Sequence, residues 1–366
     1  MNEAYVHVIA AARPNFMKVA PLLHRLRREP WCRAALVHTG QHYDPMMSDA
    51  FFRDLELPAP DFHLGIGSGS HAEQTGGVMI AYERLCLEAR PDWIVVVGDV
   101  NSTIACALVG AKLGIPVAHL EAGLRSRDRT MPEEINRIVT DTLSSLLWTP
   151  SPDADDNLRA EGIAPERIER IGNIMIDSYE MLRAHIEKVR RHEGFGLAAA
   201  HYAVVTLHRP SNVDDAASLA TLVAEIAGVA REIPVVFPVH PRTRQRLVSF
   251  GLIDILARNG GVHLTEPLGY IDFMSLVSNA AIIITDSGGI QEETTYLGIP
   301  CLTLRDTTER PITVTQGTNR LLKPGELQDT VRLILGSDRP ARRVPELWDG
   351  RTAERAAASL KRRIGA

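Results

Sequence analysis

The chain has 366 residues, which is long for a single hydrophobic core and favours two domains. Its composition, 45% hydrophobic and 23% charged, is that of a soluble globular protein. A formal net charge of −5 argues against a nucleic-acid-binding or anionic-membrane surface, and no stretch is long and apolar enough to span a membrane.

The first half of the sequence alternates short apolar runs with helical patterns. Strands are expected at 5–10, 35–39, 93–98 and 116–121, and helices at 17–28, 71–89 and 101–113. This alternation is typical of a parallel sheet covered on both faces. The last of these helices is predicted to begin at Asn101-Ser102-Thr103, whose side chains suit N-capping. The glycine-rich segment 65–77 lacks the GxGxxG spacing of a dinucleotide site, so we predict a loop followed by a helix.

Residues 165–180 carry no strong period and are predicted to cross between domains. A second series follows, with strands at 202–207, 234–239, 262–266, 281–286 and 300–304 and helices at 215–231, 271–279, 290–297 and 350–363. We therefore predict an α/β protein of two doubly wound Rossmann-like domains that face a central cleft. The expected domains are 1–168 and 169–348, with a C-terminal helix in 349–366 that packs back on the first domain.

Charged side chains follow several predicted strands of the first half. Arg13 lies just past the first strand and Lys18 in the next helix, where cations suit an anionic ligand. Asp99 and Glu121 end two further strands, and Glu133 opens a later helix. Three acids at one edge of a sheet form a set that acid–base chemistry needs.

The second half places bases at its strand ends. His208 and Arg209 follow one predicted strand, and His240 follows another. Arg310 belongs to a mixed acidic and basic segment after the last strand. Bases from both halves would suit a diphosphate.

The segment TDSGGIQEET, residues 285–294, joins a strand to a helix. Ser287, Gly288 and Gly289 offer backbone N–H groups to a phosphate at the helix start. Glu293 lies about one turn further on, where it can accept hydrogen bonds from ribose hydroxyls. Glu292 is expected to face either solvent or a neighbouring base. The segment therefore predicts a nucleoside diphosphate site.

Metal and covalent chemistry are not predicted. The sequence has no HExxH motif and no Cys/His cluster, and Gly40 interrupts the i, i+4 pair His38 and His42. No GxSxG or Cys/His pattern supports a covalent nucleophile. The four cysteines form no CxxC pair, so we expect reduced thiols in a cytoplasmic protein.

Eight segments, in order along nearly the whole chain, closely resemble motifs of the non-hydrolysing UDP-N-acetylglucosamine 2-epimerases. They are RPNFMKVAPL, VVGDVNST, HLEAGLRS, PEEINR, TLHRPSN, PVHPRT, TDSGGIQEET and RDTTERP. The resemblance implies a GT-B-type fold, a cytoplasmic homodimer, and an isomerase of cell-surface polysaccharide biosynthesis that needs neither cofactor nor metal. It also implies interconversion of UDP-GlcNAc and UDP-ManNAc, by elimination and re-addition of UDP through 2-acetamidoglucal.

The same resemblance assigns roles to individual residues. The positions that match catalytic residues of the family are Asp99, Glu121, Glu133 and His208. The positions that match its UDP-binding residues are Arg13, Lys18, Ser287, Gly288, Gly289, Glu293 and Arg310.

The chain departs from the family in the segments HRPSN and QHYDPM. In bacterial members these segments help to bind a second UDP-GlcNAc, which activates the enzyme. Gln41, Arg209 and His240 are retained, but the surrounding residues differ, so we expect this activation to be lost. The differences also fit another substrate, such as a UDP-linked 2,3-diacetamido uronic acid. A GT-B glycosyltransferase and a non-catalytic sugar-nucleotide sensor are the alternatives from other classes.

Overall fold

The computed structural model describes residues 3–11, 13–40, 54–338 and 342–365. The chain divides into two compact units: unit 1 comprises Met1–Leu182 and Glu346–Ala366, and unit 2 comprises Arg183–Pro345. The expected domain boundaries lay at 168/169 and 348/349, whereas the first division falls inside α7 (Ile174–Val189). In the described part of the chain, no helix has the length and apolar character to cross a membrane.

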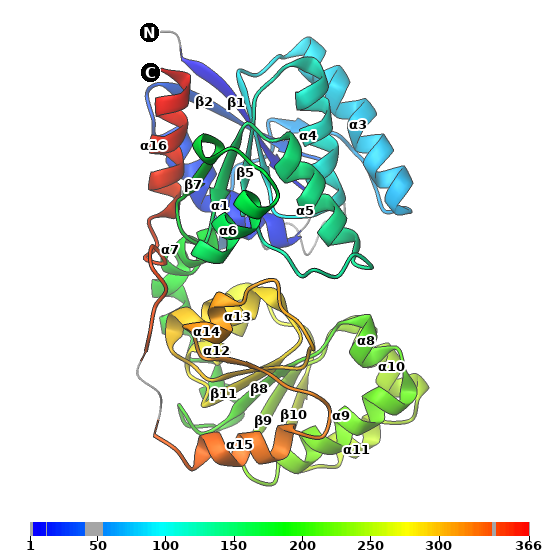
Figure 1. Ribbon diagram of the computed structural model, residues 1–366. Helices are drawn as coiled ribbons and strands as arrows, with labels where there is room; N and C mark the ends of the chain where they lie inside the picture. Colours follow the sequence, from blue (N-terminus) through cyan, green and yellow to red (C-terminus); the bar gives the residue numbers. More distant parts are fainter. Residues whose placement is uncertain (1–2, 12, 41–53, 339–341, 366) are drawn as a thin grey trace. The chain divides into compact units, whose positions relative to one another are not determined.

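Unit 1 contains a seven-stranded sheet in the order β3-β2-β1-β4-β5-β6-β7, and the pairs within it are parallel (Figure 1). The order reverses between β1 and β4, which is the position where doubly wound folds bind ligands. Its strands are β1 (Ala4–Ala10), β2 (Cys32–His38), β3 (Phe62–His63), β4 (Trp93–Val97), β5 (Val117–Leu120), β6 (Leu146–Thr149) and β7 (Ile168–Arg170).

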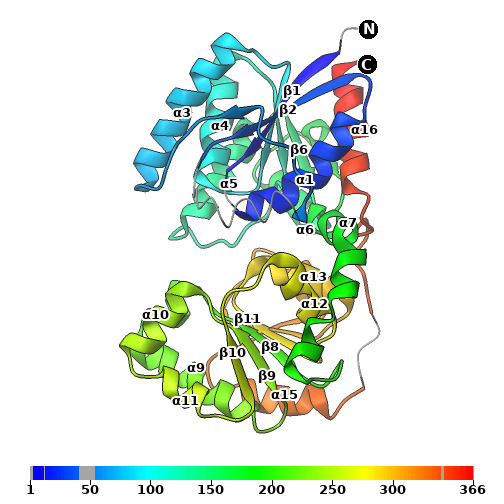
Figure 2. The same ribbon diagram turned by 180° about the vertical axis from the view of Figure 1, so that it is seen from behind.

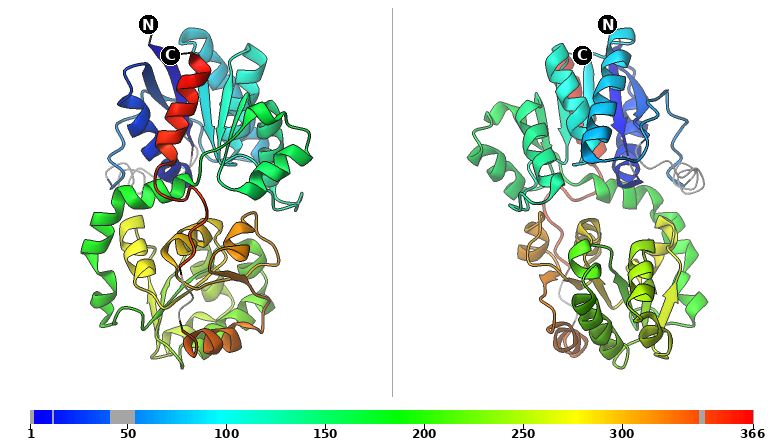
Figure 3. Two further views of the ribbon diagram at one scale, coloured as in Figure 1. Left: turned by 60° about the vertical axis from the view of Figure 1, so that its left-hand side comes forward. Right: turned by 90° about the vertical axis from the view of Figure 1, so that its right-hand side faces the viewer.

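Helices cover both faces of this sheet (Figures 2 and 3). α3 and α4 share a buried apolar cluster with β1, β2, β4 and β5, and α1 packs against α16 on the other face. The helices of unit 1 are α1 (Arg13–Arg27), α3 (His71–Glu88), α4 (Asn101–Leu113), α5 (Pro132–Leu143), α6 (Pro152–Ala160) and α16 (Thr352–Ile364), with a 3-10 turn η1 (Pro165–Arg167).

The start of α3 confirms the predicted loop followed by a helix. Ser70 and Glu73 form a capping box, in which each side chain accepts a hydrogen bond from the backbone N–H of the other residue. The predicted caps of α4 are wrong, because the N-cap is Val100 and no side chain caps this helix. Asn101 instead donates to Gln74 Oε1 at 2.8 Å, and Thr103 donates to the carbonyl oxygen of Val97 at 2.9 Å.

The C-terminal segment completes unit 1. The indole of Trp148 donates to Ser359 Oγ, and the indole of Trp348 donates to the carbonyl oxygen of Pro150, each at 2.9 Å. At the start of α16, the buried carboxyl of Asp177 accepts the backbone N–H groups of Thr352 and Ala353. α16 is therefore joined to β6 and α7 by buried polar contacts as well as by packing.

Unit 2 repeats the doubly wound arrangement with six strands in the order β10-β9-β8-β11-β12-β13, again paired in parallel. A large apolar cluster fills the space between the sheet and α9, α10, α11 and α15 (Figure 1). The strands are β8 (Ala203–Thr206), β9 (Val235–Pro238), β10 (Val262–Thr265), β11 (Ile282–Thr285), β12 (Cys301–Thr303) and β13 (Asn319–Leu321). The helices are α8 (Pro210–Val213), α9 (Ala216–Val229), α10 (Pro241–Ser249), α11 (Ile253–Ala257), α12 (Tyr270–Ser278), α13 (Gly288–Leu297), α14 (Ile312–Thr315) and α15 (Leu327–Leu335), with a 3-10 turn η2 (Arg191–Phe195).

The expected two doubly wound α/β sheets are thus confirmed. The sequence pattern missed β3, β6, β7 and β13, which have two to four residues each.

Candidate functional site

Two of the predicted carboxylates follow neighbouring strands of unit 1. Asp99 lies two residues after β4, and Glu121 directly follows β5, which pairs with β4 in parallel. The backbone N–H of Gly98 donates to the carbonyl oxygen of Leu120 at 3.0 Å, which joins the two strand ends. A Cβ atom added to Gly98 would lie only 3.6 Å from Glu121 Oε2. The fold therefore brings Asp99 and Glu121 to one edge of the sheet.

Glu121 has an unusual backbone and a cationic partner. Its φ is +75°, in the left-handed region, which costs a non-glycine residue about 1–2 kcal/mol. Its carboxylate forms an ion pair with Lys18 Nζ, and the exposed fractions of the two side chains are 8% and 12%. A carboxylate that is mostly shielded from water interacts strongly with a neighbouring cation. The site thus joins α1 to the end of β5.

Arg137 links Asp99 to α5. Its Nη1 lies 2.5 Å from Asp99 Oδ2, and its Nη2 lies 2.8 Å from Glu134 Oε2. Glu134 is buried and also accepts the backbone N–H groups of Ser126 and Arg127. Burial alone would raise the pKa of Glu134, but these donors and Arg137 lower it. Of the two adjacent glutamates at the start of α5, Glu133 and Glu134, it is therefore Glu134 that has a structural role.

Glu133, the other member of that pair, lies exposed in the first turn of α5. The next turn of the helix is fixed beside Asp99, because Asn136 Nδ2 donates to the carbonyl oxygen of Asp99 at 2.9 Å. Glu133 therefore belongs to the helix that borders Asp99, and it remains accessible.

A buried polar network beneath these residues joins the two strand ends. His119 Nδ1 lies 2.6 Å from Asp141 Oδ1, and His119 Nε2 lies 2.7 Å from the carbonyl oxygen of Gly98. Asp141 Oδ2 accepts the N–H of Gly123 at 3.1 Å and pairs with Arg125 at 2.7 Å. Burial opposes ionisation of Asp141, but His119 and Arg125 lower its pKa. His119 and Asp141 were not among the residues predicted from the sequence, and only their positions on β5 and α5 could have suggested them.

In unit 2, the predicted anion site begins α13. Ser287 is the N-cap residue, and its N–H donates to Thr285 Oγ1 at 3.0 Å. A Cβ added to Gly288 would lie 2.6 Å from Glu309 Oε1 and 2.7 Å from Arg310 Nη1, whereas a Cβ on Gly289 would meet nothing within 4 Å. The start of the helix is therefore packed closely against Arg310 on one side and open at Gly289.

Buried ion pairs surround the guanidinium of Arg310. Its Nη1 lies 2.5 Å from Glu309 Oε1, and its Nε lies 2.9 Å from Glu292 Oε1. Arg305 also pairs with Glu309, at 2.9 Å. Burial would raise the pKa of Glu309, but Arg310 and Arg305 hold this pKa far below its usual range. Glu292 was expected to face either solvent or a neighbouring base, and its ion pair with Arg310 confirms the second expectation.

His208 lies at the end of β8 in contact with Asp286, the residue that follows β11. Its Nδ1 is 2.8 Å from Asp286 Oδ1, and its ring centroid lies 5.8 Å from that of His240. Arg209 Nε donates to the carbonyl oxygen of Asp286 at 3.1 Å. Three bases predicted from two strand ends are thus neighbours. Gln41, the third residue retained from the regulatory segments, and the side chain of Arg13 lie outside the described residues.

Glu293 has a hydrogen-bond partner, Tyr270, that was not predicted from the sequence. Its Oε1 accepts a hydrogen bond from the hydroxyl of Tyr270 at 2.6 Å, and the side chain is buried. Burial raises the pKa of Glu293 to about 8. The negative charge of Glu292 raises this pKa further, whereas the hydrogen bond from Tyr270 lowers it. At neutral pH this carboxyl is therefore largely protonated and can both donate and accept hydrogen bonds.

We expect the replacement Glu293→Gln to change how stability depends on pH. The unfolded chain releases the Glu293 proton above pH 4.5 and the folded chain only near pH 8, so the free energy of unfolding of the wild type falls between these values. Glutamine carries no proton to lose. Relative to the variant, the wild type should lose on the order of 4–5 kcal/mol from pH 4.5 to pH 8. Calorimetric unfolding of both proteins across this range checks the expectation, and parallel curves would contradict it.

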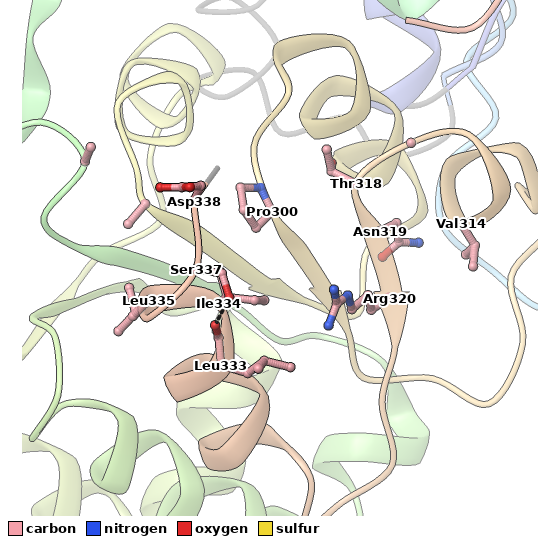
Figure 4. Close-up of a pocket in the computed structure, with 13 residues that line it drawn as sticks. Pro300, Val314, Thr318, Asn319, Arg320, Leu333, Ile334, Leu335, Ser337 and Asp338 are labelled. Atoms are coloured by element: carbon pink, nitrogen blue, oxygen red, sulfur yellow. Dashed lines mark hydrogen bonds between the residues drawn. The ribbon is translucent and has the colours of Figure 1, made fainter. Parts of the chain in front are cut away.

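One pocket of unit 2 does not coincide with these groups. It has a volume of about 480 Å³ and lies at the amino ends of β11 and β12, beside Pro300, Asn319 and Leu333 (Figure 4). The predicted residues of unit 2 follow the carboxyl ends of the same sheet. Among the residues that the structure describes, no group of three or more His, Cys, Asp or Glu side chains could hold a metal ion.

The chain is similar to known proteins in sequence and in structure. A family model for UDP-N-acetylglucosamine 2-epimerases matches residues 24–361. A UDP-N-acetylglucosamine 2-epimerase of Methanococcus maripaludis is 40% identical over 348 residues, which are 91% of this chain and 92% of that protein. A UDP-2,3-diacetamido-2,3-dideoxy-D-glucuronate 2-epimerase of Pseudomonas aeruginosa is 39% identical over 318 residues, 86% and 87% of the two chains.

Among solved structures, the chain is similar to the Methanocaldococcus jannaschii UDP-GlcNAc 2-epimerase in complex with UDP-GlcNAc and UDP. The TM-score is 0.88 at 40% sequence identity, and the match covers 98% of this chain and 99% of the other. The similarity supports the expected GT-B-type pair of Rossmann-like domains.

Proposed function

The chain belongs to the UDP-N-acetylglucosamine 2-epimerase family, and we propose that it interconverts UDP-GlcNAc and UDP-ManNAc without hydrolysing them. The observation that carries the proposal is the joint position of Asp99 and Glu121 at adjacent strand ends, each beside a cation. Inversion at C2 requires a proton to leave one face of the sugar and return to the other. A pair of carboxylates suits this requirement better than a single base does.

In the proposed reaction, a carboxylate of unit 1 removes the C2 proton while the C1–O bond breaks and UDP leaves with the electron pair. The product of this step is 2-acetamidoglucal. UDP then adds back at C1 as C2 receives a proton on the opposite face. No carbonyl activates the C2 proton, so stabilisation of the departing diphosphate must lower much of the barrier. We assign the carboxylate roles to Asp99, Glu121 and Glu133.

The residues of unit 2 are proposed to hold UDP. The open backbone at Gly289 and the guanidinium of Arg310 suit the diphosphate, together with His208. Glu293, which is buried and carries a raised pKa, suits the ribose hydroxyls. Ser287 and Gly288 of unit 2, with Arg13 and Lys18 of unit 1, complete the proposed UDP-binding set.

We further infer that the protein acts in the cytoplasm as a homodimer and supplies precursors for cell-surface polysaccharide. The four cysteines are free and buried, which supports a reducing compartment. Sedimentation of the purified protein measures the oligomeric state directly.

A second candidate substrate is favoured by the Pseudomonas aeruginosa relative, which acts on a UDP-linked 2,3-diacetamido-glucuronate. The mechanism would be unchanged, because the proton is again removed from C2. A GT-B glycosyltransferase would share the UDP site but would need an acceptor.

Incubation of the protein with UDP-GlcNAc alone in D₂O tests the proposal. We expect UDP-ManNAc with deuterium at C2, observed by NMR and mass spectrometry. Absence of both epimerisation and exchange with UDP-GlcNAc would overturn the assignment of this substrate. The same assay with the diacetamido uronic acid substrate identifies the second candidate. A glycosyltransferase would release UDP only after addition of an acceptor.

A further inference from the structure

Asp286 is a buried carboxylate that collects donors from the segment after β8. Its side chain is fully buried, and its oxygens accept the backbone N–H groups of His208 and Arg209 at 2.9–3.1 Å. Asn212 Nδ2 donates to Asp286 Oδ2 at 3.1 Å and to the carbonyl oxygen of Leu304 at the same distance. Asp286 thus fixes the backbone that carries His208.

The same carboxylate also contacts the imidazole. Burial would favour the neutral acid, but the hydrogen bonds from His208 and its neighbours lower the pKa of Asp286. An ionised carboxylate can only accept a hydrogen bond, so the ring nitrogen 2.8 Å away, His208 Nδ1, must carry the hydrogen. In the neutral ring this leaves Nε2 as the acceptor. The side chain of His208 is 42% exposed, so the ring is accessible to a ligand.

We propose that Asp286 is a positioning residue, which holds His208 in the Nδ1–H tautomer and directs Nε2 to the diphosphate of the substrate. The inference deepens the proposed function, since it rests on His208 acting at UDP. When UDP leaves, its oxygens gain negative charge, and a protonated Nε2 next to them stabilises that charge. The buried carboxylate behind the ring stabilises the imidazolium that this contact requires.

The chemistry of Asp286→Asn separates a positioning role from a merely structural one. The amide oxygen of asparagine can still accept the backbone N–H groups and the Asn212 side chain. Its NH₂ group, however, would face His208 Nδ1 as a donor, and the ring would then have to accept there. The variant should therefore keep the fold and invert the tautomer, with Nε2 carrying the hydrogen. The amide also lacks the buried negative charge that stabilises the imidazolium, so the ring in the variant offers less positive charge to the departing diphosphate.

The primary test is a long-range ¹H–¹⁵N NMR spectrum of the free protein labelled in its histidines. His208→Gln assigns the signal. We expect the neutral His208 ring to carry its hydrogen on Nδ1 in the wild type and on Nε2 in Asp286→Asn. An Nε2–H tautomer in the wild type would overturn the proposal even if the variant failed to fold. The measurement uses no substrate, so its outcome is independent of the epimerase activity.

Kinetics give the second test. For Asp286→Asn we expect kcat to fall about 10²- to 10³-fold, with KM for UDP-GlcNAc within tenfold of the wild type. The same change in a His208→Gln background should have little further effect on kcat, because the two residues act as one unit. Independent losses that multiply would contradict the proposal. Asp214→Asn is the matched control: this aspartate of unit 2 pairs with Arg242 and Arg246 and should leave both kcat and the tautomer unchanged.

Discussion

Replacement of Glu121 by glutamine is expected to lower kcat about a thousandfold while UDP affinity stays within a few-fold. Glutamine has the size of glutamate and meets the same backbone conformation at φ +75°, so the substitution removes only the charge and the basicity. A proton-transfer residue typically contributes 10²- to 10⁴-fold to the rate. Because Lys18 pairs with this carboxylate, the variant also frees a cation close to the sheet edge.

The measurements are kcat from the separated UDP sugars and the dissociation constant of UDP from calorimetry. Asp99→Asn should behave in the same way, since Asp99 lies at the neighbouring strand end. Glu161→Gln is a suitable control, because Glu161 also pairs with an arginine of unit 1, Arg125, but lies in a different segment after α6. If Glu121→Gln and Asp99→Asn both weakened UDP binding as strongly as they slowed turnover, the two residues would be ligand contacts instead.

Replacement of Arg310 by methionine is expected to weaken UDP binding roughly a hundredfold and to lower the free energy of unfolding by about 3–5 kcal/mol. Both effects have the same origin. The guanidinium lies against the first residue of α13, where the diphosphate is proposed to bind, and it neutralises Glu292 and Glu309 in the interior. Its removal leaves buried negative charge behind and removes a cation from the proposed anion site.

A double variant separates these two effects. In the double variant Arg310→Met with Glu292→Gln, position 292 no longer carries the buried negative charge that Arg310 neutralised. Much of the lost stability should therefore return. UDP affinity should remain low, because the cation is still absent. Thermal unfolding and UDP calorimetry on the single and double variants measure both quantities. Recovery of UDP affinity in the double variant would show that Arg310 acts through the fold rather than through the ligand.

The sequence predicted the two doubly wound sheets because buried parallel strands appear as continuous β-branched runs between helical patterns. Candidate residues could be found wherever charge follows such a run, as with Asp99 and Glu121. Their catalytic and UDP-binding roles remain predictions. The start of α13 was also predictable, since strand, glycines and helix are contiguous in TDSGGIQEET.

The partners of these residues could not be predicted from the sequence. Arg137 is 38 positions from Asp99, Asp286 is 78 from His208, and Tyr270 is 23 from Glu293. Each contact depends on which strands and helices become neighbours, and a local pattern does not contain that information. The capping prediction for α4 failed for the same reason. The side chain of Asn101 donates a hydrogen bond to Gln74 of α3 instead of capping its own helix.

The return of the chain to unit 1 has a consequence for the order of synthesis. Unit 2 consists of one continuous segment, whereas unit 1 needs Glu346–Ala366, which is synthesised after unit 2. Until α16 emerges, the face of α1 that it covers and the indole of Trp148 lack this partner. Unit 2 can therefore fold during translation before unit 1 has received α16. Synthesis of unit 2 thus precedes completion of the unit that carries the carboxylates proposed for catalysis.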